Sequence, residues 1–165
     1  MTALLMFIDV ETIHHSLEPY QITGNFTRRV LLCSCLVIYF CRLAICLFVF
    51  FRRKFPWIEA VIVAIVMGSI LFALTYVGGT SNEPINFFDI AGLVLFALGS
   101  YLNSHSEYLR YQWKVKPENQ GHLYTGGFFR YSMHINYFGD TILFTGWALI
   151  TQNLIMLLIP LGMTM

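Results

Sequence analysis

Two long apolar runs constrain this chain more than any other feature of its sequence. Residues 30–51 and 58–77 each hold one charged residue, Arg42 and Glu59. A helix of such a length measures about 30–33 Å, at 1.5 Å per residue. The hydrocarbon core of a bilayer is about 30 Å thick, so each run predicts a membrane-spanning helix. Two further apolar blocks follow at residues 87–101 and 138–165.

The composition supports a membrane protein and excludes other classes. Hydrophobic residues make up 57% of the 165 residues and charged residues only 12%. Soluble domains contain about 45–50% apolar and about 25% charged residues. A chain this short cannot bury such an excess, so a soluble globular enzyme and a disordered chain are both excluded. The net charge of +1 argues against a nucleic-acid partner.

We therefore predict an all-α integral membrane protein with about four to five transmembrane helices and the lipid bilayer as its partner. Residues 1–29 form an N-terminal segment, and residues 30–165 form the transmembrane domain. Residues 102–137 form a polar segment that connects the third and fourth apolar blocks. Gln152 and Asn153 interrupt the last block, which is either one continuous span or a helix-turn-helix.

Basic residues predict the orientation. Arg52–Lys54 and the basic residues at 110–116 are typical of a cytoplasmic side, and the loop at 78–86 lacks Lys and Arg. Arg28-Arg29 opposes this assignment. The protein is expected to be multi-pass, in the endoplasmic reticulum of a eukaryote or the inner membrane of a bacterium. Arg42 lies near the centre of the first span, so we expect it to pair with Glu59 or Asp89 or to line a substrate path.

Four polar residues in the connecting segment share one helical face. Asn103, Glu107, Arg110 and Lys114 are spaced i, i+4, i+7 and i+11. If the third helix continues past the membrane boundary, this stripe forms either one wall of a polar pocket or a solvated helix end with routine ion pairs.

A glycine-rich stretch and a polar motif follow. Residues 121–127 read Gly-His-Leu-Tyr-Thr-Gly-Gly, which differs from the dinucleotide-binding fingerprint and follows no strand. Residues 129–140 gather Arg, His, Asn, Tyr and Asp beside an apolar block. Such a segment forms either a polar site facing the bundle interior or an amphipathic stretch in the lipid headgroups.

In this order the residues resemble a superfamily of membrane enzymes. It comprises the C-terminal domain of steroid 5α-reductases, the sterol reductases and the isoprenylcysteine carboxyl methyltransferases. The resemblance rests on Gly121–Gly127, Phe129–Ser132 and His134–Asp140, within about Asn103–Pro160. Met133 and Ile135 stand where the family usually has Arg and Pro. Members continue past the position of Met165, so the resemblance also admits a C-terminally truncated member of the superfamily.

The resemblance implies a membrane-embedded oxidoreductase that transfers hydride from NADPH to a carbon–carbon double bond of a sterol- or lipid-like substrate. Arg130 would hold a cofactor phosphate, and His134 and Asn136 would line the cofactor cleft. Tyr124 or Tyr137 would donate the proton, supported by Asp140 or Glu107. The remaining residues assigned to cofactor binding are Gly126, Gly127, Asn103 and Arg110.

Two other functions stay open. The same pocket could hold S-adenosylmethionine in a lipid methyltransferase, where positioning of the reactants is the main task. A non-catalytic membrane protein of the same fold is the third. Cys33, Cys35, Cys41 and Cys46 lie in one apolar run without a neighbouring His, so no metal site is expected. The sequence leaves the oligomeric state open.

Overall fold

A computed structural model describes residues 24–50, 56–119 and 121–164, and every regular element within these residues is helical. Three of the helices are long and apolar enough to cross a membrane, namely Phe26–Phe50, Trp57–Gly79 and Phe87–Val115. The predicted all-α membrane bundle is thereby confirmed. The elements in chain order are α2 (Phe26–Ile45), η3 (Cys46–Phe50), α3 (Trp57–Gly79), α4 (Phe87–Val115), η4 (Pro117–Asn119), η5 (Gly127–Arg130), α5 (Ile135–Ile150), η6 (Leu154–Leu157) and α6 (Leu158–Gly162).

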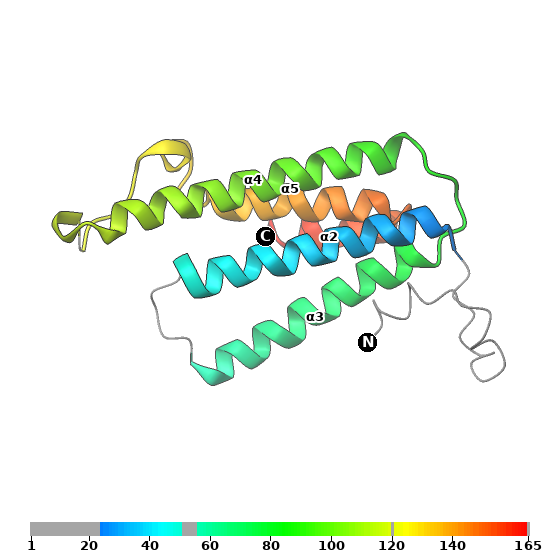
Figure 1. Ribbon diagram of the computed structural model, residues 1–165, viewed down its shortest axis with the longest axis horizontal. Coiled ribbons are helices and arrows are strands. Elements are labelled where there is room, and N and C mark those ends of the chain that lie inside the picture. Colours follow the sequence, from blue (N-terminus) through cyan, green and yellow to red (C-terminus); the bar gives the residue numbers. More distant parts are fainter. Residues whose placement is uncertain (1–23, 51–55, 120, 165) are drawn as a thin grey trace.

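Successive long helices are antiparallel, so their termini gather at the two ends of the bundle (Figure 1). One end, here called the loop end, holds the start of α2, the loop at 80–86 and the turn at 151–153. The other end, here called the motif end, holds η3, the last turns of α4 and the segment at 116–134. Helices α2 and α3 diverge toward the motif end (Figure 1), and the buried residues of α3 all lie from Leu71 onward.

The long helices overlap the predicted apolar runs, but two helix ends differ from the prediction. Helix α2 begins at Phe26 because the Asn25 side chain caps it, accepting from the N–H groups of Thr27 and Arg28 at 3.0 and 3.4 Å. Helix α4 continues to Val115 without a break, so the polar stripe lies on the same helix as the third span. For the last block, where a continuous span and a helix-turn-helix were both open, the structure has a helix-turn-helix.

That break lies at the loop end. Helix α5 has 16 residues and is about 24 Å long, shorter than a bilayer core. The chain turns at Gln152, whose φ is +57°, and Asn153 caps η6. The segments η6 and α6 then fold back against α5.

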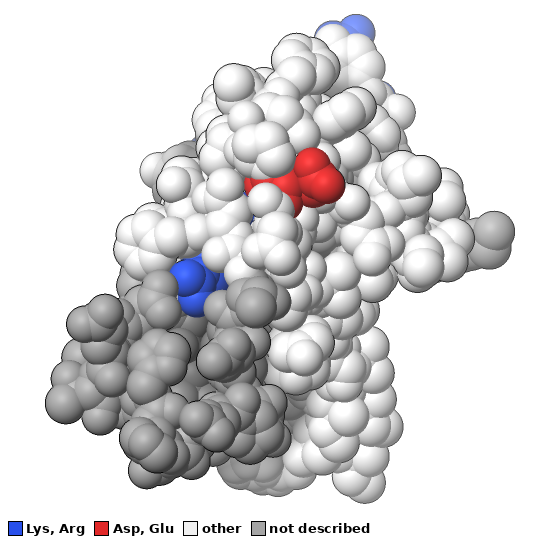
Figure 2. Space-filling model, turned by 90° about the vertical axis from the view of Figure 1, so that its right-hand side faces the viewer, with Lys and Arg blue, Asp and Glu red and all other residues white. Residues whose placement is uncertain are grey.

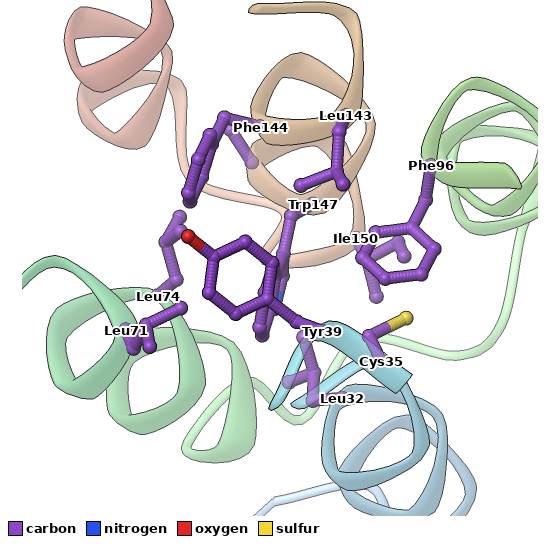
Figure 3. Packing of buried hydrophobic residues seen from close by; sticks show 11 residues of the cluster. Leu32, Cys35, Tyr39, Leu71, Leu74, Phe96, Leu143, Phe144, Trp147 and Ile150 are labelled. Atoms are coloured by element: carbon purple, nitrogen blue, oxygen red, sulfur yellow. The ribbon is translucent and has the colours of Figure 1, made fainter. Parts of the chain in front are cut away.

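The aromatic core and the exterior explain the excess of apolar residues. Trp147 of α5 lies at the centre of the core, with edge contacts to Tyr39 of α2 and Phe96 of α4 (Figure 3). Many large apolar side chains are exposed, among them Phe48, Trp57 and Leu154. A bilayer supplies the apolar environment that these exposed side chains need.

Helices α4 and α5 touch through glycines at two levels of their interface. A Cβ atom on Gly99 would lie 2.4 Å from the Leu143 nitrogen and 2.5 Å from the Gly139 oxygen. Likewise, a Cβ atom on Gly146 would lie 2.4 Å from the Gly92 oxygen. Small residues allow such close backbone approach between membrane helices. We call Gly92, Gly99, Gly139 and Gly146 the glycine seam.

A buried ion pair fastens the loop end. The Arg28 guanidinium donates from Nε and Nη2 to the two carboxylate oxygens of Asp89, at 3.0 and 2.9 Å. Its remaining donors reach Ser81 Oγ and the carbonyl oxygens of Glu83 and Pro84. Asp89 also accepts from the backbone N–H of Asn86, which makes it the second half of a capping box for α4. We call Arg28 and Asp89 the loop-end clasp.

Burial explains why the basic pair Arg28-Arg29 does not argue against the predicted orientation. Arg28 and Arg29 are both buried, so neither is a loop charge. Figure 2 views the molecule from the loop end, and the described surface there is mostly white, with a red acidic area near the centre and blue basic atoms below it and at the upper edge. The exposed basic residues Lys114, Lys116 and Arg130 lie at the motif end. Arg52–Lys54 fall outside the described residues.

We predict that Gly99→Leu destabilises the bundle by about 1–3 kcal/mol, because the new side chain meets backbone that cannot move aside. Thermal unfolding in detergent measures the effect. The matched control is Gly68→Ala on α3, since no atom lies within 4 Å of a Cβ there. Equal melting temperatures for the Gly99 variant and the wild type would contradict the close approach.

Removing the Asp89 carboxylate by Asp89→Leu is expected to cost about 3–5 kcal/mol, because Arg28 stays buried and unpaired. Unfolding in detergent followed by helical circular dichroism measures this loss. Glu83→Gln, at an exposed position of the loop that precedes α4, is the control and should leave stability within about 0.5 kcal/mol. A similar small effect for both variants would show that the clasp is not a structural requirement.

Candidate functional site

A cluster of six polar side chains lies between three apolar helices toward the motif end. Helix α2 contributes one member, α4 three and α5 two. We call them the polar cluster: Arg42, Asn103, Glu107, Arg110, Asn136 and Asp140. Five of the six were predicted as site residues, and the sixth, Arg42, was singled out for its central position in the first span.

Glu107 is the acceptor at the centre of the cluster. Its Oε1 accepts from Asn136 Nδ2 at 2.9 Å, and its Oε2 accepts from Arg110 one turn later on α4. The Arg110 guanidinium also lies over the Phe129 ring, 5.6 Å from its centroid. Glu107 is therefore held in one orientation by α4 and α5 together.

The second ion pair joins α2 to α5. Arg42 Nη2 donates to Asp140 Oδ1 at 2.9 Å, and the Arg42 guanidinium carbon lies 5.0 Å from the centroid of the Tyr39 ring. The expectation that Arg42 pairs with Glu59 or Asp89 was wrong. Asp89 lies at the loop end, where Arg28 occupies it, and Asp140 is the acidic residue at the depth of Arg42.

The glycine seam sets the register of this cluster. A Cβ atom on Gly139 would lie 2.8 Å from the Asn103 nitrogen, so α5 lies directly against α4 at this level. From there Asn103 Nδ2 donates to the Asn136 carbonyl oxygen at 3.0 Å. The same approach brings the Asn136 side chain within reach of Glu107. The residues that surround Gly139 on both helices are thus positioned by a backbone contact.

The glycine-rich turn packs on its own tyrosine. A Cβ atom on Gly126 would lie 2.8 Å from the Tyr124 ring, and Gly127 has a φ of +56° that favours glycine. The Tyr124 ring also contacts Trp113 and Phe129, with centroids 5.5 and 5.6 Å away. These glycines let the turn lie flat against the end of α4, with the Tyr124 hydroxyl beside Gly126 and Gly127.

Three predicted residues lie at the motif-end surface and not in the cluster. Arg130, His134 and Tyr137 are all exposed, Tyr137 by 61%. The His134 and Tyr137 rings lie near each other, with centroids 5.7 Å apart. His134 is the N-cap residue of α5 and forms no side-chain cap. The structure therefore divides the predicted set into an interior polar cluster and an exposed group at the start of α5.

Sequence reasoning missed the pairing of Arg42 and the glycine seam, although both left a signal. Gly92 and Gly99 on one helix and Gly139 and Gly146 on the other repeat the same seven-residue spacing, which places small residues on one face. Depth can be counted along each helix from its end at the motif end, at about 1.5 Å per residue. Arg42 then lies about 12 Å and Asp140 about 8 Å from that end of the bundle. Depth counting thus favours Asp140 over Asp89.

Chemically, the motif end combines anion-binding donors with acid–base groups at the edge of an apolar bundle. Charged side chains inside a membrane protein usually face the bundle interior and mark a functional path.

Comparison with curated proteins and with solved structures returned no match. Residues 48–165 match the model of a family described as a protein of unknown function, DUF1295. This region contains the motif end from η3 onward and the whole of α3, α4 and α5. Because it makes up most of the chain, the protein belongs to the DUF1295 family.

Proposed function

We propose that this protein is a membrane-embedded reductase that uses NADPH to reduce a carbon–carbon double bond in a sterol- or lipid-like substrate. The observation that carries the proposal is the arrangement at the motif end. An interior polar cluster lies between apolar helices, and an exposed group of basic and aromatic residues lies at the start of α5. The resemblance to the steroid 5α-reductase superfamily supports this assignment.

The donors at the start of α5 fit the phosphates of a dinucleotide. Arg130 is exposed and bonds to no group in the described part of the chain. The N-cap residue of α5 forms no side-chain cap, so the first-turn backbone N–H groups and the positive end of the helix dipole are not taken up by that side chain. Together with His134, these groups would hold a phosphate.

The same donors favour NADPH over S-adenosylmethionine. NADPH carries a pyrophosphate and a further phosphate, whereas S-adenosylmethionine carries none. Guanidinium groups and helix N-termini are the groups that proteins use for phosphate. A methyltransferase with S-adenosylmethionine remains the alternative, to be decided by the binding experiment below.

When bound, NADPH supplies a hydride, and the protein must supply one proton. Tyr137 is the donor that we propose, because its exposed hydroxyl can approach a substrate from the bilayer. The ring of Tyr124, by contrast, is packed between Trp113 and Phe129. Glu107 holds Asn136, which precedes Tyr137, at a fixed place on α5.

The motif end should face the cytosol, where NADPH is found. Lys114, Lys116 and Arg130 gather at this end, and positively charged loops favour the cytoplasmic side. We propose the endoplasmic reticulum as the location in a eukaryote and the inner membrane in a bacterium.

Cofactor binding is tested by thermal unfolding of the purified protein in detergent with NADPH, NADH or S-adenosylmethionine at equal concentration. NADPH at about 100 times its Kd should stabilise the protein by about 2.7 kcal/mol. Arg130→Gln should weaken this stabilisation, and Lys116→Gln, the exposed basic control outside the site, should not. Stabilisation by S-adenosylmethionine alone would replace the reductase with a methyltransferase. No effect of any of the three would favour the non-catalytic alternative.

Tyr137→Phe is expected to lower turnover about 100-fold or more, the usual contribution of a positioned acid, while NADPH still stabilises the protein. Oxidation of NADPH in the presence of a lipid acceptor measures turnover. Tyr131→Phe, also exposed and on the same segment, is the matched control and should keep full activity. Full turnover in the Tyr137 variant would exclude it as the proton donor.

A further inference from the structure

Arg42 differs from Arg28, the arginine of the loop-end clasp, in the hydrogen bonds that its guanidinium nitrogens form. Its side chain is about nine-tenths buried, with 10% of its surface exposed. Asp140 accepts from Nη2 at 2.9 Å, but the buried Nε and Nη1 atoms have no acceptor among the described residues. In the loop-end clasp, by contrast, each guanidinium nitrogen of Arg28 donates to an oxygen.

Leaving guanidinium donors unpaired in an apolar bundle is unfavourable. Neither the hydrocarbon of lipid chains nor the neighbouring apolar side chains can accept their hydrogen bonds, and a buried donor without an acceptor pays its full desolvation cost. An acceptor for Nε and Nη1 would therefore be favourable, and none of the described residues supplies one within hydrogen-bond geometry.

The charges around Arg42 select a neutral acceptor. Asp140 balances Arg42, and Glu107 balances Arg110, so the two pairs already sum to zero. A carboxylate or phosphate brought to Arg42 would add an unbalanced negative charge beside Asp140 in a medium of low dielectric constant. A carbonyl oxygen accepts hydrogen bonds without that cost.

The side chains around the Arg42–Asp140 pair are partly exposed on the outside of the bundle, although the Nε and Nη1 atoms themselves are covered. Asp140 is 23% exposed on its side chain, and Cys46, one turn after Arg42, is half-buried. On α2 the flanking Ile38 and Ile45 are each exposed by about half. The helix then widens into the π-helical turn Cys46–Phe50, a conformation that occurs often at functional sites.

We propose that Arg42 Nε and Nη1 bind the carbonyl oxygen of a neutral lipid that enters from the bilayer between α2 and α5. The ligand class is an uncharged amphiphile bearing a ketone or ester. Insofar as this lipid is the hydride acceptor, the inference rests on the proposed function. Binding itself needs no cofactor, so the two are tested separately.

Three radiolabelled probes of similar chain length, measured by equilibrium binding in detergent, test the proposal. Methyl oleate offers a neutral ester carbonyl, oleate an anion, and 1-octadecene no oxygen. Wild-type protein should bind methyl oleate at least about tenfold more tightly than either of the others, which corresponds to one hydrogen bond from a charged donor. Equal binding of methyl oleate and 1-octadecene, or tighter binding of oleate, would overturn the proposal.

Two variants of Arg42 assign the binding to this residue. Arg42→Lys keeps a charge opposite Asp140 but removes the Nε and Nη1 donors, and should weaken methyl oleate binding about tenfold. The double variant Arg42→Met with Asp140→Leu removes the pair without leaving a lone charge, and should abolish the preference for the ester. Arg28→Met with Asp89→Asn makes a similar change at the loop end and should keep it. Unchanged preference in both Arg42 variants would refute the assignment.

Parallel NADPH titrations separate the two proposals. NADPH stabilisation that persists in Arg42→Lys, together with lost ester binding, supports both. Ester binding in a protein that NADPH does not stabilise supports the lipid site and refutes the reductase. NADPH stabilisation without any preference for the ester refutes the lipid site and leaves the reductase standing.

Discussion

The backbone contact between α4 and α5 is the constraint on which the candidate site depends. Where Gly99 meets Gly139 and Gly92 meets Gly146, no side chain separates the helices, so their relative depth cannot drift by a turn. At that depth Asn103 reaches the first-turn carbonyl of Asn136, and Asn136 reaches Glu107. In lipid there is little hydrophobic force between helices, and tight packing of small residues takes its place.

Two arginine–aspartate pairs at different depths perform different tasks. Arg28 at the loop end is fully buried and fully hydrogen-bonded to Asp89 and the neighbouring loop. That pair ties the start of α2 to the start of α4. Arg42 is hydrogen-bonded to Asp140 through one nitrogen, and its other two guanidinium nitrogens are buried without an acceptor among the described residues. The difference in hydrogen-bond satisfaction, and not the ion pair itself, marks the second pair as a candidate for ligand binding.

The motif end separates a fixed interior from an accessible exterior. Glu107, Asn136 and Arg110 are held by one another, whereas Arg130, His134 and Tyr137 are exposed at the start of α5. Under the proposed function, a water-soluble molecule would bind at the surface and a lipid-soluble one at the helix interface. Such a division suits a reaction between a polar cofactor and an apolar acceptor.

The sequence alone determined the environment and most of the helices, because long apolar runs and a low charge content admit only a membrane bundle. It also determined which polar residues share a helical face, since Asn103, Glu107 and Arg110 follow helical spacing along α4. The tertiary structure decided which charges meet. Arg42 and Asp140 lie far apart in the sequence, and they pair only because the helices are antiparallel and the glycine seam fixes the depth of α5. Propensity and periodicity report on one helix at a time, so the register between two helices cannot be read from either.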